Sequence, residues 1–386
     1  MTTVPFGTWT KRAVLLQDLS ARSAAPLVAT AQLSRRCNLR CVHCFQVERD
    51  VPELSTEQWK TVLKRLADAG VLFLTLTGGE PALRDDLLQL IRHARKLSFA
   101  IRLKSNGVLL NADLCDALSA AHLLEAHLSV YAAGPDAHDR VTRHRGSHVR
   151  TMTAARRLRD RGTRVVLVCP LMAETFDFYE DLIRLAAVEG MDYFFDPSIK
   201  VQEDGCTAPV SHRLTDGQIK RLLADPRVFR SGEIPKAEDV LDQPVCRVGR
   251  TAVFVAPDGE VWPCMRLAVP MGNLLHAPLE RIWVSNAELD RFASIRWRDL
   301  PVCRECALVP YCIRCHVDAL REDGNLYGPS RLACRLARIR ARVSLEQRST
   351  GLGPARDAHE PPGARAQEGS DEPPTVPTSH RQRRTR

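Results

Sequence analysis

Three cysteines near the beginning of the chain have a spacing suited to metal chemistry. Cys37, Cys41 and Cys44 form a C-x3-C-x2-C pattern just after a short apolar run at 27–33. A loop with three thiols can bind three irons of a cuboidal iron–sulfur cluster, which leaves the fourth iron without a protein ligand. Structural zinc usually takes four protein ligands, and no fourth thiol or Cys/His pair lies nearby. A disulfide would leave one thiol over and needs an oxidising compartment. The pattern therefore indicates a catalytic cluster with an open iron.

Polar residues follow the next apolar runs of the sequence. The second run ends in Thr-Gly-Gly-Glu-Pro, which includes Gly78, Gly79 and Glu80. Two glycines let the backbone approach a ligand closely, and the carboxylate can accept hydrogen bonds from an ammonium group. The third run ends with Ser105 and Asn106, whose side chains can bond ribose hydroxyls. A plain strand-to-helix turn would look the same at either place, so both alternatives stay open.

Seven further cysteines crowd the region from 246 to 334. Cys246 and Cys264 stand in a C-x12-G-x4-C pattern. The rest form C-x2-C-x5-C-x2-C and one last cysteine, at Cys303, Cys306, Cys312, Cys315 and Cys334. Seven thiols are too many for one metal and suit two sites. Four of them, Cys303 to Cys315, could alternatively form a zinc ribbon. Cys115 and Cys169 fall in a predicted helix and strand, where we expect buried apolar thiols.

Alternating short apolar runs and longer amphipathic segments position these motifs. Six strands are predicted at 27–33, 72–77, 100–104, 125–129, 165–170 and 193–196. Helical periodicity is found at 56–69, 87–97, 112–120, 149–161 and 179–189. Such repeats indicate an α/β fold with a parallel sheet, either open or part of a barrel. Because sites in parallel sheets gather at the carboxyl ends of the strands, the motifs are expected to lie together.

Composition narrows the class of protein. With 386 residues, 44% hydrophobic and 26% charged, the chain suits two or three globular domains. No run reaches the roughly 18 apolar residues of a membrane span, and no secretory signal is evident, so we predict a cytoplasmic protein. Thirteen cysteines there point to metal rather than disulfides. The net charge of +9 is spread over helices without a basic–aromatic stripe, which disfavours nucleic acid.

The C-x3-C-x-Φ-C motif, with His43 at Φ, resembles the signature of the radical S-adenosylmethionine (radical SAM) enzymes. The resemblance implies a partial (β/α)6 TIM-type barrel, with a [4Fe–4S] cluster bound in the loop after the first strand. It also implies that the cofactor S-adenosylmethionine chelates the open iron and is cleaved reductively to a 5′-deoxyadenosyl radical. The Gly-Gly-Glu-Pro segment resembles the family's GGEP motif, so Gly78, Gly79 and Glu80 are expected to hold the cofactor's amino group.

By the same resemblance, further residues are expected around the cofactor. Ser129, at the end of the fourth strand, is expected near the ribose, and Arg140 is expected to pair with the cofactor carboxylate. An arginine pairs well with a carboxylate, but Arg140 could also be a plain surface residue. His43 is expected against the adenine.

The second cysteine array resembles the SPASM extension, which holds two auxiliary [4Fe–4S] clusters. The resemblance implies an outer cluster on Cys303, Cys306, Cys312 and Cys334, and an inner one on Cys246, Cys264 and Cys315. The family's last spacing is x3 where this sequence has x2, which puts the ligand geometry in doubt. The inner set has only three thiols, so its cluster keeps an open iron or takes a ligand from elsewhere, for which Cys206 is a candidate.

The resemblance implies an enzyme that abstracts hydrogen from a substrate, with auxiliary clusters that accept the resulting electron or bind the substrate. SPASM enzymes mostly modify ribosomally made peptides or proteins, so a peptide maturase is the leading hypothesis. Met265 stands where the sulfatase maturases of this class have Asp, which disfavours that activity. A radical enzyme acting on a small molecule in cofactor or metabolite biosynthesis is the alternative. A non-catalytic, metal-stabilised binding protein is a third reading.

Partners and domains follow from the same reading. We expect a peptide or protein substrate and an electron donor of the flavodoxin or ferredoxin type. About 26 residues precede the first strand, too few for a leader-binding domain, so we expect a separate leader-binding protein. The expected divisions are an N-terminal arm (1–26), the barrel core (27–197), a connecting region (198–245), a small cysteine-rich iron–sulfur domain (246–347) and a disordered tail (348–386).

Overall fold

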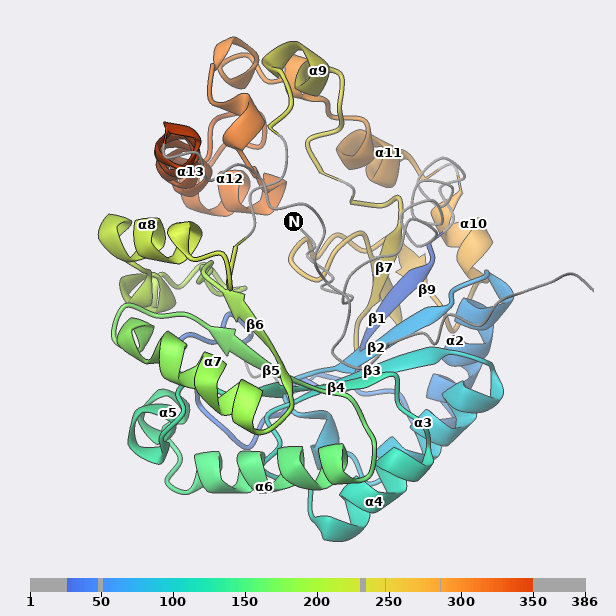
Figure 1. Cartoon of the computed structure of the whole chain (residues 1–386). Helices are drawn as coiled ribbons and strands as arrows, with labels where there is room; N and C mark the ends of the chain where they lie inside the picture. Colours follow the sequence, from blue (N-terminus) through green and yellow to red (C-terminus); the bar gives the residue numbers. More distant parts are fainter. Residues whose placement is uncertain (1–25, 48–50, 230–233, 247, 285, 350–386) are drawn as a thin grey trace, which may run out of the picture. The chain divides into compact units, whose positions relative to one another are not determined.

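Six parallel strands form the centre of the fold, as the alternating pattern predicts. The computed structural model describes residues 26–47, 51–229, 234–246, 248–284 and 286–349, so the predicted arm and tail lie almost wholly outside the described residues. The strands are β1 (Val28–Gln32), β2 (Phe73–Thr77), β3 (Ala100–Ser105), β4 (Glu125–Ser129), β5 (Val165–Pro170) and β6 (Asp192–Asp196). They pair in sequence order and in parallel, and the sheet curves into the predicted partial barrel (Figure 1).

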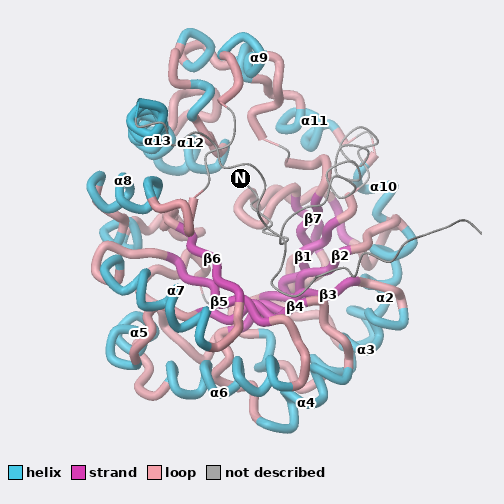
Figure 2. Tube along the Cα trace, in the orientation of Figure 1, coloured by secondary structure: helices cyan, strands magenta, loops and turns pink. Residues whose placement is uncertain are grey.

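Helices cover the outer face of this curved sheet (Figures 1 and 2). These helices are α2 (Thr56–Asp68), α3 (Leu87–Lys96), α4 (Ala112–Ala120), α5 (Pro135–Thr142), α6 (Ser147–Asp160) and α7 (Tyr179–Val188). All except α5 were predicted. The eight residues of α5 are too few to show a helical period, although Pro135 stands at the first turn, where proline is well tolerated.

The side chains of the strands divide between an apolar outer face and a polar inner face. Leu74, Leu76 and Leu103 are buried in the core between sheet and helices. Because side chains alternate along a strand, Thr75 and Arg102 point to the opposite, inner face. The inner face of the sheet therefore carries polar side chains in the middle of β2 and β3.

The cysteine-rich region extends the same sheet instead of standing apart from it. β7 (Ala252–Val255) pairs in parallel with β1, and β8 (Glu260–Trp262) and β9 (Gly272–Asn273) follow as antiparallel strands. The resulting sheet has nine strands in the order β6-β5-β4-β3-β2-β1-β7-β8-β9. The expected boundary at 246 thus lies only six residues before β7, which pairs with the edge strand β1 of the barrel sheet. The barrel and the cysteine-rich region are therefore joined by one continuous sheet.

Short helices and turns make up the remainder. The connecting region contains α8 (Asp216–Ala224) and α9 (Ala237–Leu241), which had not been predicted. The later helices are α10 (Leu279–Trp283), α11 (Ala287–Ala293), α12 (His316–Asp323) and α13 (Arg331–Ser349). A second apolar core, which includes Trp297 and Leu300, packs beneath these elements, and several cysteines lie against it.

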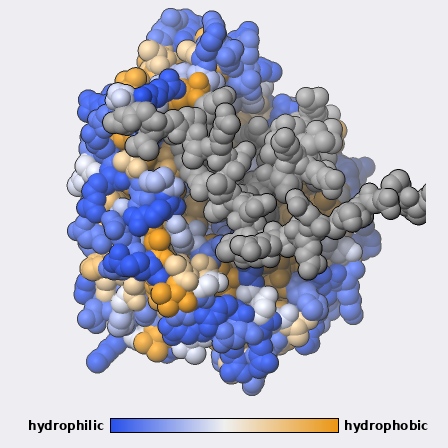
Figure 3. Space-filling view, viewed as in Figure 1, coloured by the Kyte–Doolittle hydropathy of each residue, from blue (hydrophilic) through white to orange (hydrophobic). Residues whose placement is uncertain are grey.

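Hydrophilic side chains cover much of the described surface (Figure 3). Among the described helices, none combines the length and the apolar composition that a membrane crossing requires.

Candidate active site and cluster-binding sites

The loop with Cys37, Cys41 and Cys44 follows β1 directly and is half-buried. The end of α5 supports its backbone, because the amides of Arg40 and Val42 donate to the carbonyls of Thr142 (3.3 Å) and Val141 (3.0 Å). Thus α5, which the sequence pattern did not reveal, helps to shape the cysteine loop.

The thiols of this loop lie in an environment that opposes their ionisation. Burial and, to a lesser degree, the neighbouring Cys44 and Cys37 thiols raise the pKa of Cys41 to about 12, although the hydrogen bond from Tyr131 acts in the opposite direction. Burial also raises the pKa of Cys44. Thiolates are the form that binds metal, and a bound cation reverses this effect by stabilising the ionised sulfur. The site therefore fits an iron–sulfur cluster, whose irons would supply the positive charge that these thiols need.

Gly78 and Gly79 let the end of β2 approach the start of the cysteine loop. The Gly79 amide donates to the Ser34 carbonyl (2.9 Å), and the Glu80 amide donates to the Arg36 carbonyl (2.8 Å). A Cβ atom on Gly79 would lie 2.2 Å from the Arg36 oxygen, and one on Gly78 would lie 2.5 Å from the Ser34 oxygen. The close approach in this structure is thus to the backbone of the cysteine loop.

Glu80 is fully buried and is held by three donors. Its carboxylate accepts from the Asn106 amide (2.7 Å), the Ala82 amide (3.0 Å) and the Ser105 hydroxyl (2.8 Å). Burial raises the pKa of Glu80, whereas these hydrogen bonds favour the charged form and lower it. Ser105 and Asn106, expected at the ribose, therefore serve here to fix Glu80.

Asn106 also connects this network to the cysteine loop. Its side-chain nitrogen donates to the Asn38 side-chain oxygen (2.8 Å) and lies 4.0 Å from the Cys37 sulfur. The ends of β2 and β3 and the cysteine loop thus meet in one hydrogen-bonded assembly. The structure brings together the predicted residues Cys37, Glu80, Ser105 and Asn106.

Tyr131 is a residue of this site that sequence reasoning missed. Its hydroxyl donates to the Cys41 sulfur (3.7 Å), and its ring lies 4.9 Å from the His43 ring in an edge-to-face arrangement. Ser129 hydrogen-bonds to the same phenol, and burial raises the Tyr131 pKa well above its usual range. Burial lowers the pKa of His43 to about 4, so its ring is neutral. The sequence feature that could have indicated Tyr131 is its place just after the fourth strand, two positions beyond Ser129.

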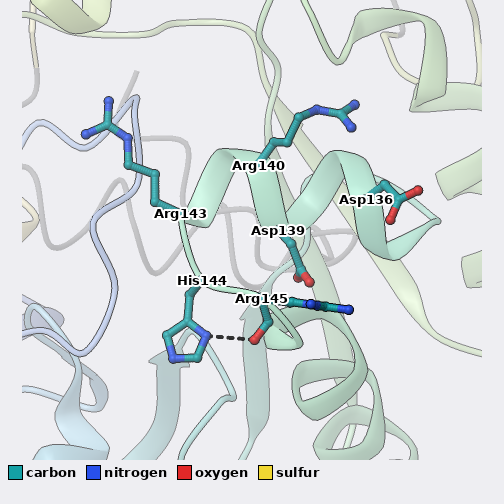
Figure 4. A pocket seen from close by; sticks show the side chains of 6 residues that line it. All are labelled: Asp136, Asp139, Arg140, Arg143, His144 and Arg145. Carbon is teal, nitrogen blue, oxygen red and sulfur yellow. Dashed lines mark hydrogen bonds between the residues drawn. The ribbon is translucent and has the colours of Figure 1, made fainter.

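Arg140 lies apart from the Glu80 assembly. It is exposed on α5 and lines an open pocket with Asp136, Asp139, Arg143, His144 and Arg145 (Figure 4). The Asp139 carboxylate is already engaged by the loop that starts α6, including the His148 amide (2.9 Å). Figure 4 shows the Arg140 and Arg143 side chains directed away from Asp139. Within the described ranges Arg140 makes no ion pair.

A charged cluster lines the inner face of the barrel beneath this site. Arg102, Glu125 and His127 are buried and contact one another, with His127 Nε2 3.1 Å from a Glu125 oxygen. Lys104 follows on the same face of β3 and is accessible to solvent, yet burial lowers its pKa. The positive charge of Arg102 lowers the pKa of Lys104 further, whereas the carboxylates of Asp196 and Glu125 raise it.

The C-terminal cysteines fall into two sets. The Cys246 and Cys264 thiols both interact electrostatically with Cys315, and this set corresponds to the expected inner site. The Cys312 thiol interacts with Cys334, Cys303 and Cys306 instead, and its pKa is raised to about 12, chiefly by burial. Cys315 thus has its electrostatic effect on the Cys246 and Cys264 thiols. Among the described residues, no three His, Cys, Asp or Glu side chains surround the position of a single ion.

The remaining cysteines are separate from these sets. Cys206 is exposed in a loop whose neighbours bind the first cysteine loop, since the Glu203 amide donates to the Phe45 carbonyl (2.9 Å). The described contacts do not bring Cys206 to the inner set. Cys115 and Cys169 are buried in α4 and β5, as expected.

Comparisons with known proteins agree with this geometry. Residues 32–186 match the Radical SAM superfamily, and residues 246–307 match the SPASM iron–sulfur cluster-binding domain. The PqqA peptide cyclase of Rhodopseudomonas palustris is 28% identical over 346 residues, covering 82% of this chain and 89% of that protein. The AdoMet-dependent heme synthase of Methanosarcina barkeri is 26% identical over 79% of this chain and 95% of that protein.

Solved structures share the fold at low sequence identity. Streptococcus suis SuiB bound to its precursor peptide SuiA superposes with a TM-score of 0.66 at 16% identity, over 84% of this chain and 80% of SuiB. The enzyme anSMEcpe with bound AdoMet and the Cp18Cys peptide gives a TM-score of 0.64 at 16% identity, over 84% and 99% of the two chains. These matches support a SAM-binding [4Fe–4S] cluster with AdoMet in the first region and auxiliary iron–sulfur clusters in the second.

We expect Gly79→Ala to destabilise the protein by about 3 kcal/mol, because the new Cβ would collide with backbone that carries the cysteine loop. Urea unfolding of the reconstituted protein, with iron content per chain, measures the effect. Gly217→Ala in α8 is the matched control, since its Cβ meets nothing within 4 Å. Equal stability of the two variants would contradict the packing argument.

We expect Glu80→Gln to weaken S-adenosylmethionine binding about tenfold to a hundredfold, as the loss of one charge-assisted hydrogen bond predicts. Equilibrium dialysis with the reconstituted protein measures the dissociation constant. Iron content and melting temperature report whether the cysteine loop survives the change. Unchanged affinity in a fully loaded variant would remove Glu80 from the cofactor site.

Proposed function

Because the chain belongs to the radical SAM superfamily and carries a C-terminal SPASM domain, we propose that it is a peptide maturase. The observation that supports this most strongly is the combination of a three-thiol loop fixed to Glu80 with two further thiol sets in the same compact unit. Proteins similar over most of the chain include PqqA peptide cyclases, and SuiB and anSMEcpe share the fold with peptides bound. The reaction would join or oxidise residues of a ribosomally made peptide.

The residues around the first site have distinct tasks in this proposal. Cys37, Cys41 and Cys44 would hold the iron–sulfur cluster, and the bound cluster would supply the electron for reductive cleavage of S-adenosylmethionine. Glu80 accepts hydrogen bonds from the cofactor's ammonium group, while Ser105 and Asn106 hold Glu80 in its ionised form. Tyr131 orients the Cys41 sulfur and excludes water beside His43.

The outer parts of the cofactor and the substrate would occupy the space around this assembly. Ser129 is proposed near the ribose and His43 near the adenine. Arg140 has no carboxylate partner within the described residues, so a turn of its long side chain would allow it to pair with the cofactor carboxylate. The peptide would enter the polar interior of the barrel, where Lys104 and Asp196 offer charges of both signs.

Two auxiliary [4Fe–4S] clusters are proposed for the two C-terminal thiol sets. Cys303, Cys306, Cys312 and Cys334 would hold the outer cluster completely. Cys246, Cys264 and Cys315 would hold the inner cluster with one iron left open. A separate leader-binding protein is proposed to present the peptide.

The small-molecule alternative rests on a specific relative, the AdoMet-dependent heme synthase, which is similar over nearly its whole length. The two functions differ in their substrates. A short open reading frame beside this gene that encodes a peptide with Cys, Tyr or Lys would favour the maturase.

The proposed function predicts about twelve irons per chain after anaerobic reconstitution, with release of 5′-deoxyadenosine on reduction. Incubation with a synthetic peptide encoded beside the gene is expected to remove hydrogen from that peptide, as measured by mass spectrometry. About four irons with zinc would instead indicate a structural zinc module. Cofactor cleavage without change in any neighbouring peptide, but with conversion of a small metabolite, would favour the alternative.

An electron donor is the second proposed partner, and an unneutralised basic surface supports it. Arg40, Arg143, Arg145 and Arg150 are exposed and have no carboxylate partner among the described residues. By contrast, arginines further along α6 are neutralised, such as Arg157 by Asp116. Arg40 lies within the cysteine loop, and α5 binds that loop, so this surface adjoins the first cluster site. Acidic electron carriers would be attracted to it.

We expect the double change Arg145→Glu with Arg150→Glu to lower flavodoxin-driven 5′-deoxyadenosine release about tenfold at low salt, as loss of electrostatic steering predicts. Release driven by dithionite, which needs no docking, is expected to stay unchanged. The control is Arg184→Glu with Arg291→Glu, an equal change of charge on α7 and α11. An equal loss in both double variants would show that net charge, rather than this surface, matters.

A further inference from the structure

One charged side chain contacts the sulfur of Cys315 in the inner thiol set, and two more are connected to it by ion pairs. Arg266 donates from Nη1 to Cys315 Sγ (3.4 Å), and its Nη2 donates to Asp318. Lys200, just beyond β6, donates to the other Asp318 oxygen (2.8 Å). Asp318 lies one helical turn after Cys315 on α12 and is buried. Two cations against one carboxylate leave one net positive charge beside the Cys315 sulfur.

A second buried cation, Arg314, stands between Cys312 and Cys315 in the sequence, where the x2 spacing departs from the SPASM pattern. Arg314 is only 2% exposed and donates to the carbonyls of Gly328 (2.6 and 3.0 Å) and Leu326 and to His316 Nδ1 (3.0 Å). No carboxylate contacts Arg314 among the described residues. A buried guanidinium without a carboxylate is costly unless other negative charge compensates it.

Arg266 differs from Arg314 because it is hydrogen-bonded to a sulfur of the inner thiol set. This contact makes Arg266 the cation whose effect on a cluster can be argued from the structure.

We propose that Arg266 raises the reduction potential of the inner auxiliary cluster. This inference rests on the proposed function, which places a cluster on each thiol set. Reduction adds a negative charge to a cluster, and a nearby cation or a hydrogen bond to a ligating sulfur stabilises that charge. Arg266 is thus a positioning residue that makes the inner cluster a better electron acceptor.

Arg266→Met in the full chain, reconstituted with all its clusters, tests this inference. It removes the cation and the hydrogen bond to Cys315, while Lys200 remains to neutralise Asp318. We expect the equilibrium constant for reduction of one auxiliary cluster to fall at least about tenfold, which corresponds to about 59 mV for a one-electron couple. Redox titration followed by electron paramagnetic resonance measures this, and the SAM-binding cluster is recognised by its response to added cofactor.

Two further variants separate electrostatics from general damage. Arg266→Lys keeps the charge on a flexible chain, so most of the potential should be retained. Arg213→Met removes a similarly buried arginine that pairs with Glu322 of the same helix α12 but contacts no thiol, and should leave the potential unchanged.

The outcomes distinguish this inference from the proposed function. If the wild-type protein has auxiliary signals and Arg266→Met titrates like Arg213→Met, the role of Arg266 is refuted while the proposed function stands. If the loaded wild-type protein has no signal other than the cofactor-responsive one, both are refuted. A lower potential in Arg266→Met alone, at full iron content, supports the inference.

Discussion

The close approach of the Gly78–Gly79 turn to the start of the cysteine loop is the constraint on which the active site depends. Two backbone hydrogen bonds, to Ser34 and Arg36, join the turn to the loop, and neither glycine has room for a side chain. The same turn delivers Glu80 to the end of β3, where three donors fix its carboxylate. One short segment therefore sets both the shape of the cysteine loop and the position of the carboxylate.

Charge explains why metal and fold are interdependent in this chain. Burial opposes ionisation of Cys41 and Cys312, and Arg314 is buried without a carboxylate partner among the described residues. Bound iron would stabilise the ionised cysteines and so lower their pKa values. The resulting thiolates would supply negative charge to compensate the buried Arg314 guanidinium. Loading of the auxiliary sites is thus expected to stabilise the protein as well as to serve its chemistry.

Sequence reasoning recovered the parts of the fold that have a regular period or a short local motif. All six barrel strands and five of the helices around them were predicted, because apolar residues recur in them at strand or helix spacing. The helix α5 and the strand β7 were missed, since α5 is short and β7 is defined by its pairing with β1 across more than 200 residues of sequence. Such pairing leaves no local signal.

The same distinction applies to the site. Local motifs identified the cysteines and Glu80. The role of Ser105, however, depends on its contact with Glu80, which is 25 positions earlier in the sequence, and the role of Tyr131 depends on its contact with Cys41, which is 90 positions earlier. Spacing alone therefore favoured a ribose for Ser105, whereas the structure assigns it to Glu80. Tertiary contacts between strand ends decide which polar group faces a ligand and which supports another side chain.

The arrangement of the two cysteine regions follows from contacts that act together. β7 pairs with β1, so the strand that leads into the first cysteine loop also carries the C-terminal region. The loop after β6 adds a second connection, since Glu203 pairs with Arg35 (2.7 Å) and Lys200 pairs with Asp318 on α12 (2.8 Å). The sheet and the 200–203 segment thus connect the two cysteine regions at two independent places.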